Sequence, residues 1–393
     1  MSSSLHSAPM KSAQINRCQL LGCVRRIVVK VGSTTVSHNF DLNAERLDAL
    51  VQDLASVRQK GKEVILVTSG AIAAGTGRLR LTQRPQTLPG LQAAAAVGQS
   101  RLMHAYEHRF QQYNLITGMM LLTQDDFTSR ERYTYISDTL RALLRLGAIP
   151  IINENDTVAV EEIKVGDNDT LAAYMTNLAE ADLLIILSDQ KGFYTADPRK
   201  HPQAEFINVV PYITEELKSA AGSAGSVRGT GGMITKLRAA EIVTGSGEMM
   251  VLASGCEPQV VNRILAGEDI GTLFLPHGWM SGRKRWIAYS RPPKGFVFVD
   301  SGARDAVTCY GRSLLPSGIR RVEGDFAHGD TVSCLDENYS EFARGLSNYN
   351  TRELTQIMGK QTREIKNILG HHYFDEIIHR DNLVVMPKRR RDT

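Results

Sequence analysis

The sequence predicts an α/β protein with an open, mostly parallel sheet sandwiched between helices, followed by a small β-rich domain. Three observations support this prediction. From residue 25 to residue 276, helical and strand patterns alternate along the chain. The strands are continuous apolar runs, which are typical of parallel strands buried on both faces. After residue 276 the long helices give way to short strand-like runs and turn residues, and 393 residues are enough for two domains.

The first predicted unit is a strand, a helix and a second strand. Residues 27–29 form a β-branched run that ends close to Lys30 and Gly32. Residues 44–60 carry apolar side chains at helical spacing, and residues 64–67 form another buried strand. A lysine and a glycine at the end of a strand can offer a phosphate a positive charge and exposed backbone N–H groups. The same pattern also occurs where no ligand binds.

A stretch of small residues, 68–75 (TSGAIAAG), follows the second strand and leads into a helix. Unpaired N–H groups and the positive end of the helix dipole would then face the crevice at the sheet edge. Such a site attracts an anion, or an oxygen that gains negative charge during a reaction. Close helix–sheet packing, which also requires small residues, explains the same pattern.

The richest polar stretch is residues 153–169 (NENDTVAVEEIKVGDND), directly after a buried strand at 148–152. Helices are predicted before it at 91–110 and 130–146, with a strand at 116–122. Ligands of open α/β sheets bind beyond the carboxyl ends of the strands. Short amides and carboxylates in that place suit a small charged ligand with an amino group. A polar loop with an N-cap for the next helix explains these residues as well.

Two more polar segments follow predicted strands on the same side. A helix through residue 179 and an apolar strand at 183–187 lead into the polar loop 188–198. Residues 221–232 (AGSAGSVRGTGG) are too rich in glycine for regular structure and precede a helix that contains Lys236. A glycine loop before a helix can hold phosphates, although the Walker A spacing is absent. A plain linker is the alternative.

Together these pieces predict phosphoryl transfer. Two lysines, two glycine-rich turns and a cluster of carboxylates converge on one edge of the sheet, where they could neutralise a triphosphate and hold an acceptor. No histidine lies in these motifs, so a histidine general base is not indicated. An acceptor that is already an anionic oxygen, such as a carboxylate, needs no base.

The motifs KVGSTT, VTSGAIAAG, INENDTVAV, IKVGDND, SDQKGFYTADPR and GTGGMITK, in this order, closely resemble the glutamate 5-kinases of the amino-acid kinase superfamily. The resemblance covers residues 25–276 and implies the amino-acid kinase fold, while residues 283–376 resemble a PUA domain. It implies ATP-dependent phosphorylation of the γ-carboxyl of L-glutamate to L-glutamyl 5-phosphate, the first step of proline biosynthesis. Mg²⁺ is expected to be carried by ATP, with no residue ligating a metal directly.

The resemblance also implies roles for individual residues. Lys30 and Lys236 match lysines that stabilise the phosphates, and Asp169 matches the acid that orients them. The residues expected to bind glutamate are Ser69, Gly70, Asn153, Asp156, Asp167 and Asn168. The residues expected to bind ATP are Lys30, Gly32, Ser188, Asp189, Thr230, Gly231, Gly232, Met233, Ile234, Thr235 and Lys236. Ser188 stands where many bacterial relatives have threonine, and it keeps the hydroxyl.

The expected organisation is a flexible N-terminal extension (1–24), a catalytic domain (25–276), a linker (277–282), a PUA-like domain (283–376) and a C-terminal tail (377–393). The extension is Ser-rich and acid-free, which is typical of a disordered tail and in part of a transit peptide. The basic C-terminal tail could be a localisation signal or a solvated end. The five cysteines are scattered and form no metal-spaced pairs, which favours a reducing, cytoplasmic location. No apolar run approaches the roughly 18 residues that span a bilayer.

The expected partners are L-glutamate, proline as a possible feedback inhibitor, and further copies of the chain in a dimer or tetramer. Two other functions are kept as alternatives: a carboxylate kinase acting on another amino acid, and a PUA-type RNA-binding protein. From residue 283 onward there are 19 Lys and Arg against 14 Asp and Glu. That excess is too small to predict RNA binding, and a basic cluster at 283–285 is more often a solvated face or an interdomain contact.

Overall fold

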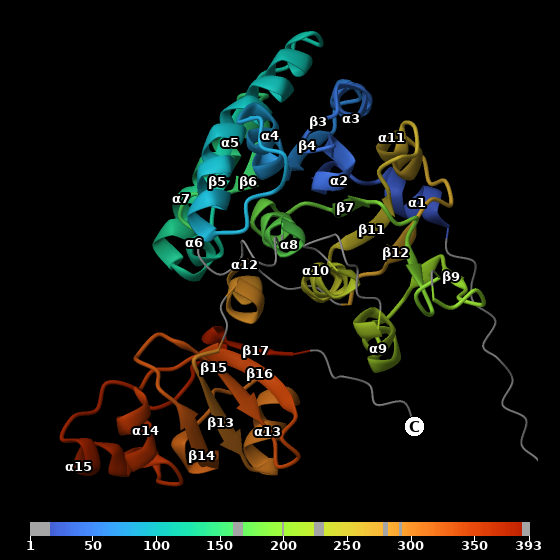
Figure 1. The fold of residues 1–393 in the computed structure, drawn as a ribbon. Helices are drawn as coiled ribbons and strands as arrows, with labels where there is room; N and C mark the ends of the chain where they lie inside the picture. The colour runs from blue at the N-terminus through green and yellow to red at the C-terminus, as the bar shows by residue number, and fades with distance from the viewer. Residues whose placement is uncertain are drawn as a thin grey trace, which may run out of the picture.

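The computed structural model describes residues 16–159, 168–198, 200–223, 232–277, 282–290 and 293–386. An eight-stranded sheet with helices on both faces forms the larger part, and a five-stranded sheet forms the smaller C-terminal part (Figure 1). This agrees with the predicted fold class.

The larger sheet is parallel except at one pair of strands. Its strands, in spatial order, are β10 (Val209–Val210), β12 (Thr272–Phe274), β11 (Met249–Ser254), β7 (Leu183–Ser188), β1 (Arg26–Val31), β4 (Glu63–Val67), β6 (Ile149–Glu154) and β5 (Thr117–Leu122). Only β11 and β12 run antiparallel. The strands β1, β7 and β6 are buried almost throughout, as their apolar runs predicted.

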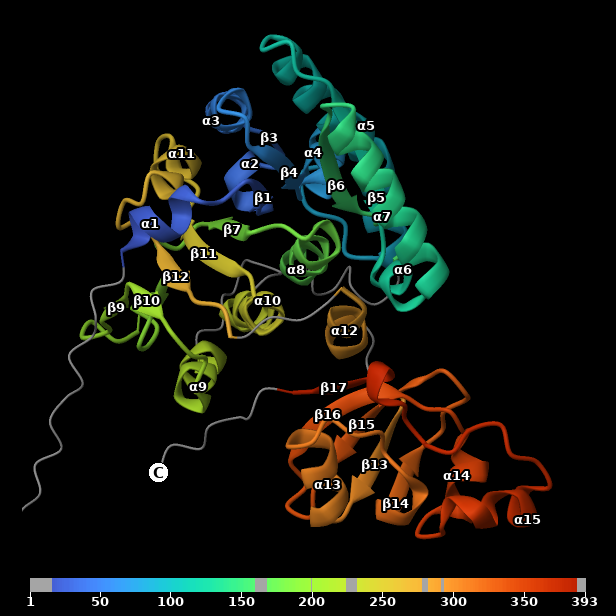
Figure 2. The same ribbon diagram turned by 180° about the vertical axis from the view of Figure 1, so that it is seen from behind.

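Each face of this sheet carries its own hydrophobic core (Figures 1 and 2). The helices over one face are α6 (Gln124–Thr128), α7 (Arg130–Arg145), α8 (Asn168–Ala179) and α10 (Met233–Ser246). The helices over the other face are α1 (Arg17–Gly22), α3 (Ala44–Gln59), α5 (Leu88–Gln111) and α11 (Val260–Leu265). Every residue of α8 is buried, so this helix lies inside the larger part of the structure.

Short elements connect these layers. They are α2 (Ser33–Val36), β2 (Ser37–His38), β3 (Asp41–Leu42), α4 (Ala71–Arg78), β8 (Phe193–Tyr194), β9 (Phe206–Ile207) and α9 (Glu215–Ser223). Residues 221–223, expected to be irregular because of their glycine-rich surroundings, belong to α9. The glycine-rich residues 224–231 lie outside the described residues.

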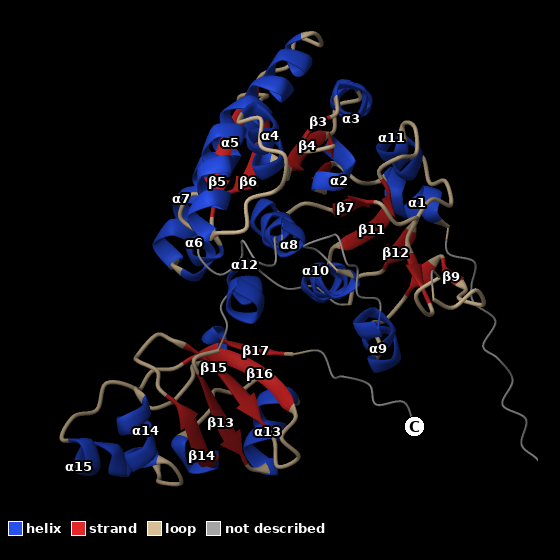
Figure 3. Ribbon diagram, in the orientation of Figure 1, coloured by secondary structure: helices blue, strands red, loops and turns tan. Residues whose placement is uncertain are grey.

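The C-terminal part is a separate β-rich module (Figure 3). Its strand order is β14 (Ile319–Gly324), β13 (Gly295–Val299), β15 (Thr331–Leu335), β16 (Glu341–Leu346) and β17 (Leu383–Val385). The helices α13 (Ser301–Thr308), α14 (Thr351–Ile357) and α15 (Ile365–Leu369) accompany it, with single 3-10 turns at Pro316–Gly318, Thr362–Glu364 and Arg380–Asn382. The helix α13 was not predicted.

The N-terminal region differs from the expectation of a flexible extension over 1–24. Residues 17–22 form α1, and Leu21 is fully buried. The Arg17 guanidinium donates to the backbone oxygens of Ile270 and Gly271, at 2.9 Å each. A buried arginine that satisfies several carbonyl groups ties this helix to the far edge of the sheet. Residues 1–15 lie outside the described residues.

The described residues 282–290, which lie between the two parts, contact both of them. They form α12 (Gly282–Arg285) and a π-helical turn, η2 (Trp286–Ser290). Trp286 donates its indole N–H to the Phe127 carbonyl at 3.0 Å, and Arg344 of the C-terminal module donates to the Ala288 carbonyl at 2.8 Å. Arg285 belongs to the basic cluster that was expected to be a solvated face or an interdomain contact. Its side chain is buried and pairs with Glu248 at 2.6 Å. This segment therefore joins both parts of the molecule.

No helix among the described residues is both long and apolar enough to pass through a membrane.

Candidate functional site

The carboxyl ends of parallel neighbouring strands bring distant motifs to one edge of the sheet. β1 lies between β4 and β7, and β6 follows β4. Lys30, Ser69, Asn153 and Ser188 stand at or just beyond the ends of these four strands. Asn153 is the fifth residue of β6, although the sequence predicted that the strand ended before it. The expected crevice edge is thus assembled from four segments.

A buried carboxylate joins the two lysines. Lys30 Nζ lies 2.6 Å from Asp169 Oδ1, and Lys236 Nζ lies 3.1 Å from Asp169 Oδ2. All three side chains are less than 10% exposed, at 8%, 9% and 1% for Lys30, Lys236 and Asp169. The Thr235 hydroxyl also donates to Asp169 Oδ2 at 2.8 Å. Three elements, β1, α8 and α10, therefore place two ammonium groups around one acid.

The charge on Asp169 is held by its partners. Burial alone would raise the pKa of this carboxyl, but the two lysines and the Thr235 hydroxyl hold the pKa well below its ordinary value. Asp169 is therefore ionised at neutral pH. One acid facing two lysines leaves the cluster with a net positive charge, which attracts a polyphosphate.

A chain of amides lies beside this cluster. The Asn168 amide nitrogen donates to the Thr68 carbonyl at 2.8 Å, to Ser69 Oγ at 2.7 Å and to Asn153 Oδ1 at 3.1 Å. The Asn153 amide nitrogen donates in turn to Gln99 Oε1 at 2.7 Å. The Asn168 carbonyl oxygen is buried and has no hydrogen-bond partner among the described residues. A buried acceptor of this kind suits a ligand that carries N–H groups.

Asp156 is half-buried just beyond β6. Burial raises the pKa of its carboxyl to about 6, although Arg84 acts in the opposite direction. A half-buried carboxyl group with a pKa near neutral is typical of a binding residue, because a cationic ligand would restore its charge.

The predicted nucleotide residues that are described gather around the same edge. Ser188 is buried and donates to Asp189 Oδ1 at 3.0 Å, while Asp189 is exposed. Gly232 is the N-cap of α10, followed by the half-buried Met233 and the exposed Ile234. Gly32 caps α2, and its N–H contacts the Leu187 carbonyl at a long 3.4 Å. Three expected residues, Asp167, Thr230 and Gly231, lie outside the described residues.

Position 70 favours glycine, because a larger residue would be strained there. Gly70 caps α4 with a φ of +108°, a left-handed value that favours glycine, and a Cβ there would lie 3.1 Å from Val36 Cγ2. Gly75 and Gly98 serve packing instead, because a Cβ on either would lie 1.8 Å from a backbone oxygen of the opposite helix. The packing alternative thus holds for the end of the small-residue stretch, but between α4 and α5 rather than between a helix and the sheet.

Sequence reasoning missed the contribution of α5. Gln99 holds Asn153, and the buried Tyr106 hydroxyl lies 2.8 Å from Thr68 Oγ1. These residues are seven apart, so they share one face of the helix. The only available signal was that spacing, which an ordinary core-facing stripe also produces.

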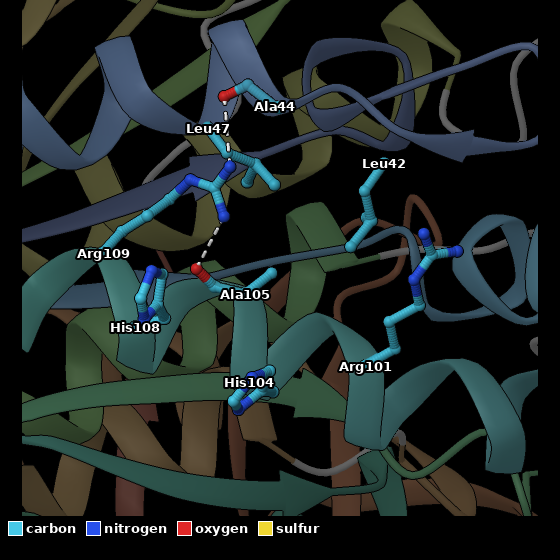
Figure 4. Close-up of a pocket in the computed structure, with 8 residues that line it drawn as sticks. All are labelled: Leu42, Ala44, Leu47, Arg101, His104, Ala105, His108 and Arg109. Atoms are coloured by element: carbon cyan, nitrogen blue, oxygen red, sulfur yellow. Dashed lines mark hydrogen bonds between the residues drawn. The ribbon is translucent and has the colours of Figure 1, made fainter.

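A hollow is lined by residues of β3, α3 and α5 (Figure 4). Its arginines are already paired, Arg101 with Asp41 at 2.6 Å and Arg109 with Asp48 at 2.7 Å. Within the part of the chain that the structure describes, no group of three or more His, Cys, Asp or Glu side chains is arranged to hold a metal ion.

Comparison with known proteins identifies the family. The model of the amino acid kinase family matches residues 25–253, and that of the PUA domain matches residues 295–369. The chain is 53% identical over 365 residues to the glutamate 5-kinase of Caldanaerobacter subterraneus subsp. tengcongensis, covering 92% of this chain and 98% of that protein. It is 50% identical over 372 residues to the glutamate 5-kinase of Citrifermentans bemidjiense, covering 94% and 100%. The enzyme of that name from Moorella thermoacetica is 48% identical over 372 residues, covering 94% and 98%.

The lysine–aspartate cluster, the parallel sheet that builds it and these relatives agree, and the chain belongs to the amino acid kinase family, among the glutamate 5-kinases that carry a C-terminal PUA domain.

Proposed function

We propose that the protein transfers the γ-phosphoryl group of ATP to the γ-carboxyl of L-glutamate, which gives L-glutamyl 5-phosphate, the first intermediate of proline biosynthesis. The observation that carries this proposal is the pair of lysines, 206 positions apart in the sequence, held by one buried acid next to a chain of hydrogen-bonded amides. The named relatives supply the identity of the acceptor.

On the phosphate side, Lys30 and Lys236 stabilise the negative charge of the transferring group, and Asp169 orients both ammonium groups. Backbone N–H groups at Gly32 and Gly70 provide further donors at helix starts. We assign the rest of the nucleotide site to Ser188, Asp189 and residues 230–236, of which 230 and 231 rest on the resemblance alone.

On the acceptor side, Ser69, Asn153, Asp156 and Asn168 surround the amino acid. A γ-carboxylate oxygen attacks the γ-phosphorus of ATP, the bond from that phosphorus to the β,γ-bridging oxygen breaks, and ADP leaves. No proton is removed from the acceptor, which fits a site whose predicted motifs lack a histidine base. Asp167 is assigned to this side from the resemblance alone.

Mg²⁺ is proposed to enter with ATP, because the described acids form no cage and the nearest carboxylate, Asp169, is committed to two lysines. When bound, the ion neutralises charge on the phosphates. The protein residues that would face the ATP-bound ion are the two lysines and the exposed Asp189.

Four further properties are proposed on the resemblance: inhibition by proline through the glutamate region, assembly into a dimer or tetramer, a cytoplasmic location, and a domain division near residues 277–282. RNA binding by the C-terminal module is disfavoured by its charges. Arg304, Arg320, Arg321 and Arg344 each pair with a neighbouring acid in the same module. Paired arginines attract a phosphate backbone weakly.

The first test is trapping of the acyl phosphate with hydroxylamine in the presence of ATP and a panel of amino acids. Hydroxamate should form from L-glutamate. Hydroxamate from aspartate but not glutamate would identify the alternative carboxylate kinase and overturn the assignment.

The second test is Lys236→Ala, which should lower turnover by about 10²-fold or more, because the transferring phosphoryl group loses a buried countercharge. Lys366→Ala, an exposed lysine on α15, is the matched control and should leave turnover unchanged. If Lys236→Ala behaved like the control, the loop before α10 would be a linker without a catalytic role.

A further inference from the structure

We propose that Gln99 of α5 is a positioning residue that sets the preference of the acceptor site for a substrate with an α-amino group. This inference rests on the proposed function, since it concerns the same acceptor pocket. Gln99 lies outside the motifs that predicted the site, and we propose that it orients Asn168 through Asn153.

The argument starts from the direction of each hydrogen bond. The Thr68 carbonyl can only accept, so the Asn168 amide nitrogen must face it, and the 2.8 Å contact shows that it does. That nitrogen also lies 3.1 Å from Asn153 Oδ1, which must therefore be the oxygen of the Asn153 amide. The Asn153 nitrogen is then directed away from Asn168 and needs an acceptor of its own.

Gln99 supplies that acceptor. Its Oε1 lies 2.7 Å from the Asn153 amide nitrogen, in a region where Asn153 is only 1% exposed. Without this oxygen, Asn153 would bury an unsatisfied donor and would gain by rotating away from Asn168. Gln99 is half-buried, and its own amide nitrogen makes only a 3.8 Å contact with Met119 Sδ. Its oxygen is therefore its main contribution.

The hydrogen-bonded series from Gln99 through Asn153 ends at the Asn168 carbonyl oxygen, which we assign to the ligand. With its nitrogen directed at three acceptors, Asn168 presents its carbonyl oxygen, which is buried and without a partner among the described residues. Asn168 directly precedes Asp169 at the start of α8, so the two side chains leave the same turn of this helix. An ammonium group is the donor that best satisfies a buried amide oxygen, since each N–H then makes a charge-assisted bond.

The position of α5 supports this role. Gly98, the residue before Gln99, packs against the first turn of α4, where a Cβ would lie 1.8 Å from the Ala71 carbonyl oxygen. Helix α4 begins directly after Ser69 and Gly70, so the close contact fixes Gln99 relative to the acceptor loop. Tyr106, seven residues further along the same face of α5, forms a hydrogen bond with the Thr68 hydroxyl.

The test compares L-glutamate with glutarate, the same dicarboxylate without the amino group. In the near-isosteric variant Gln99→Leu, KM for L-glutamate should rise about tenfold, the equivalent of one hydrogen bond, while the inhibition constant of glutarate stays within about twofold. The turnover number and KM for ATP should stay near wild type, because the lysine cluster is untouched. Gln99→Glu, which keeps an oxygen at the accepting position, should retain the preference for L-glutamate over glutarate.

Gln111→Leu, on the exposed last turn of α5, is the control for replacing a glutamine of this helix, and it should change none of these constants. Equal weakening of glutamate and glutarate in Gln99→Leu would mean that Gln99 only maintains the shape of the pocket, and would overturn the proposal. An unchanged KM for L-glutamate would do the same. A wild-type protein that forms no hydroxamate from L-glutamate would instead refute the proposed function, so the two failures are distinguishable.

Discussion

Replacing Asp169 by asparagine tests the centre of the site. The substitution keeps the shape of the side chain and an acceptor for the Thr235 hydroxyl, but it removes the negative charge between the two lysines. At separations of 2.6 and 3.1 Å, each attraction amounts to about 5–6 kcal/mol at an effective dielectric constant of roughly 20. The cost of burying three charges offsets much of this attraction.

The expected net loss in the free energy of unfolding is therefore about 3–5 kcal/mol, the usual cost of leaving a buried charge without its partner. Urea denaturation at pH 7.5 measures it directly. Because Asp169 has a pKa below its ordinary value, its stabilisation is present above the pKa of an unfolded aspartate and is lost as the pH falls. The variant should therefore lose less stability in acid than the wild type.

Turnover of the variant should fall by about 10²-fold, since the lysines lose the group that orients them. Asp375→Asn is the matched control, because that side chain is 70% exposed and its loss should change stability by less than about 0.5 kcal/mol. The interpretation of the cluster is refuted if Asp169→Asn unfolds at the wild-type urea concentration and keeps wild-type turnover.

Three further substitutions probe other contacts. Since burial raises the pKa of Asp156 to about 6, KM of the wild type for L-glutamate should rise as the pH falls below 6. The variant Asp156→Asn should have a high KM that does not depend on pH in this range. Parallel pH profiles of KM in the two proteins would contradict this role of Asp156. Arg285→Ala should destabilise the protein more at pH 8 than at pH 6, because Glu248, whose pKa is raised to about 7, is largely neutral at pH 6. Equal losses of stability in urea denaturation at the two pH values would exclude a charge effect. Gly98→Ala should lower the free energy of unfolding by about 1–3 kcal/mol, because the added methyl group forces α4 and α5 apart. Gly22→Ala is the control, since a Cβ at Gly22 has no atom within 4 Å. Similar melting temperatures for the two variants would disprove the close contact.

The sheet and the approach of the lysines followed from local patterns. A strand buried on both faces must be apolar throughout, so its ends are visible where polar residues begin. Parallel strands share one carboxyl edge, and that rule brings Lys30 of β1 toward Ser188 of β7. Errors at this edge were small, as with Asn153, which the structure includes in β6.

Other features depend on partners that no local pattern reveals. Gln99 looks like any polar residue on a helix until β6 brings Asn153 to it. Arg285 stands in a basic run, yet its partner Glu248 lies 37 positions earlier and turns it inward. Helices as short as α1, with six residues, hold too few turns for an apolar period to be recognised, and only tertiary contacts stabilise them.

The connecting segment changes where the catalytic unit can be cut. Tyr289 occupies the space over Gly245, where a Cβ would lie 2.0 Å from its hydroxyl, and Arg285 neutralises Glu248 just beyond the end of α10. The first turn of the same 14-residue helix, about 14 Å from Gly245 along the helix axis, carries Lys236. A chain severed at residue 276 would expose the groove at Gly245 and strand a buried acid, so any truncation meant to isolate phosphoryl transfer should retain residues through 290.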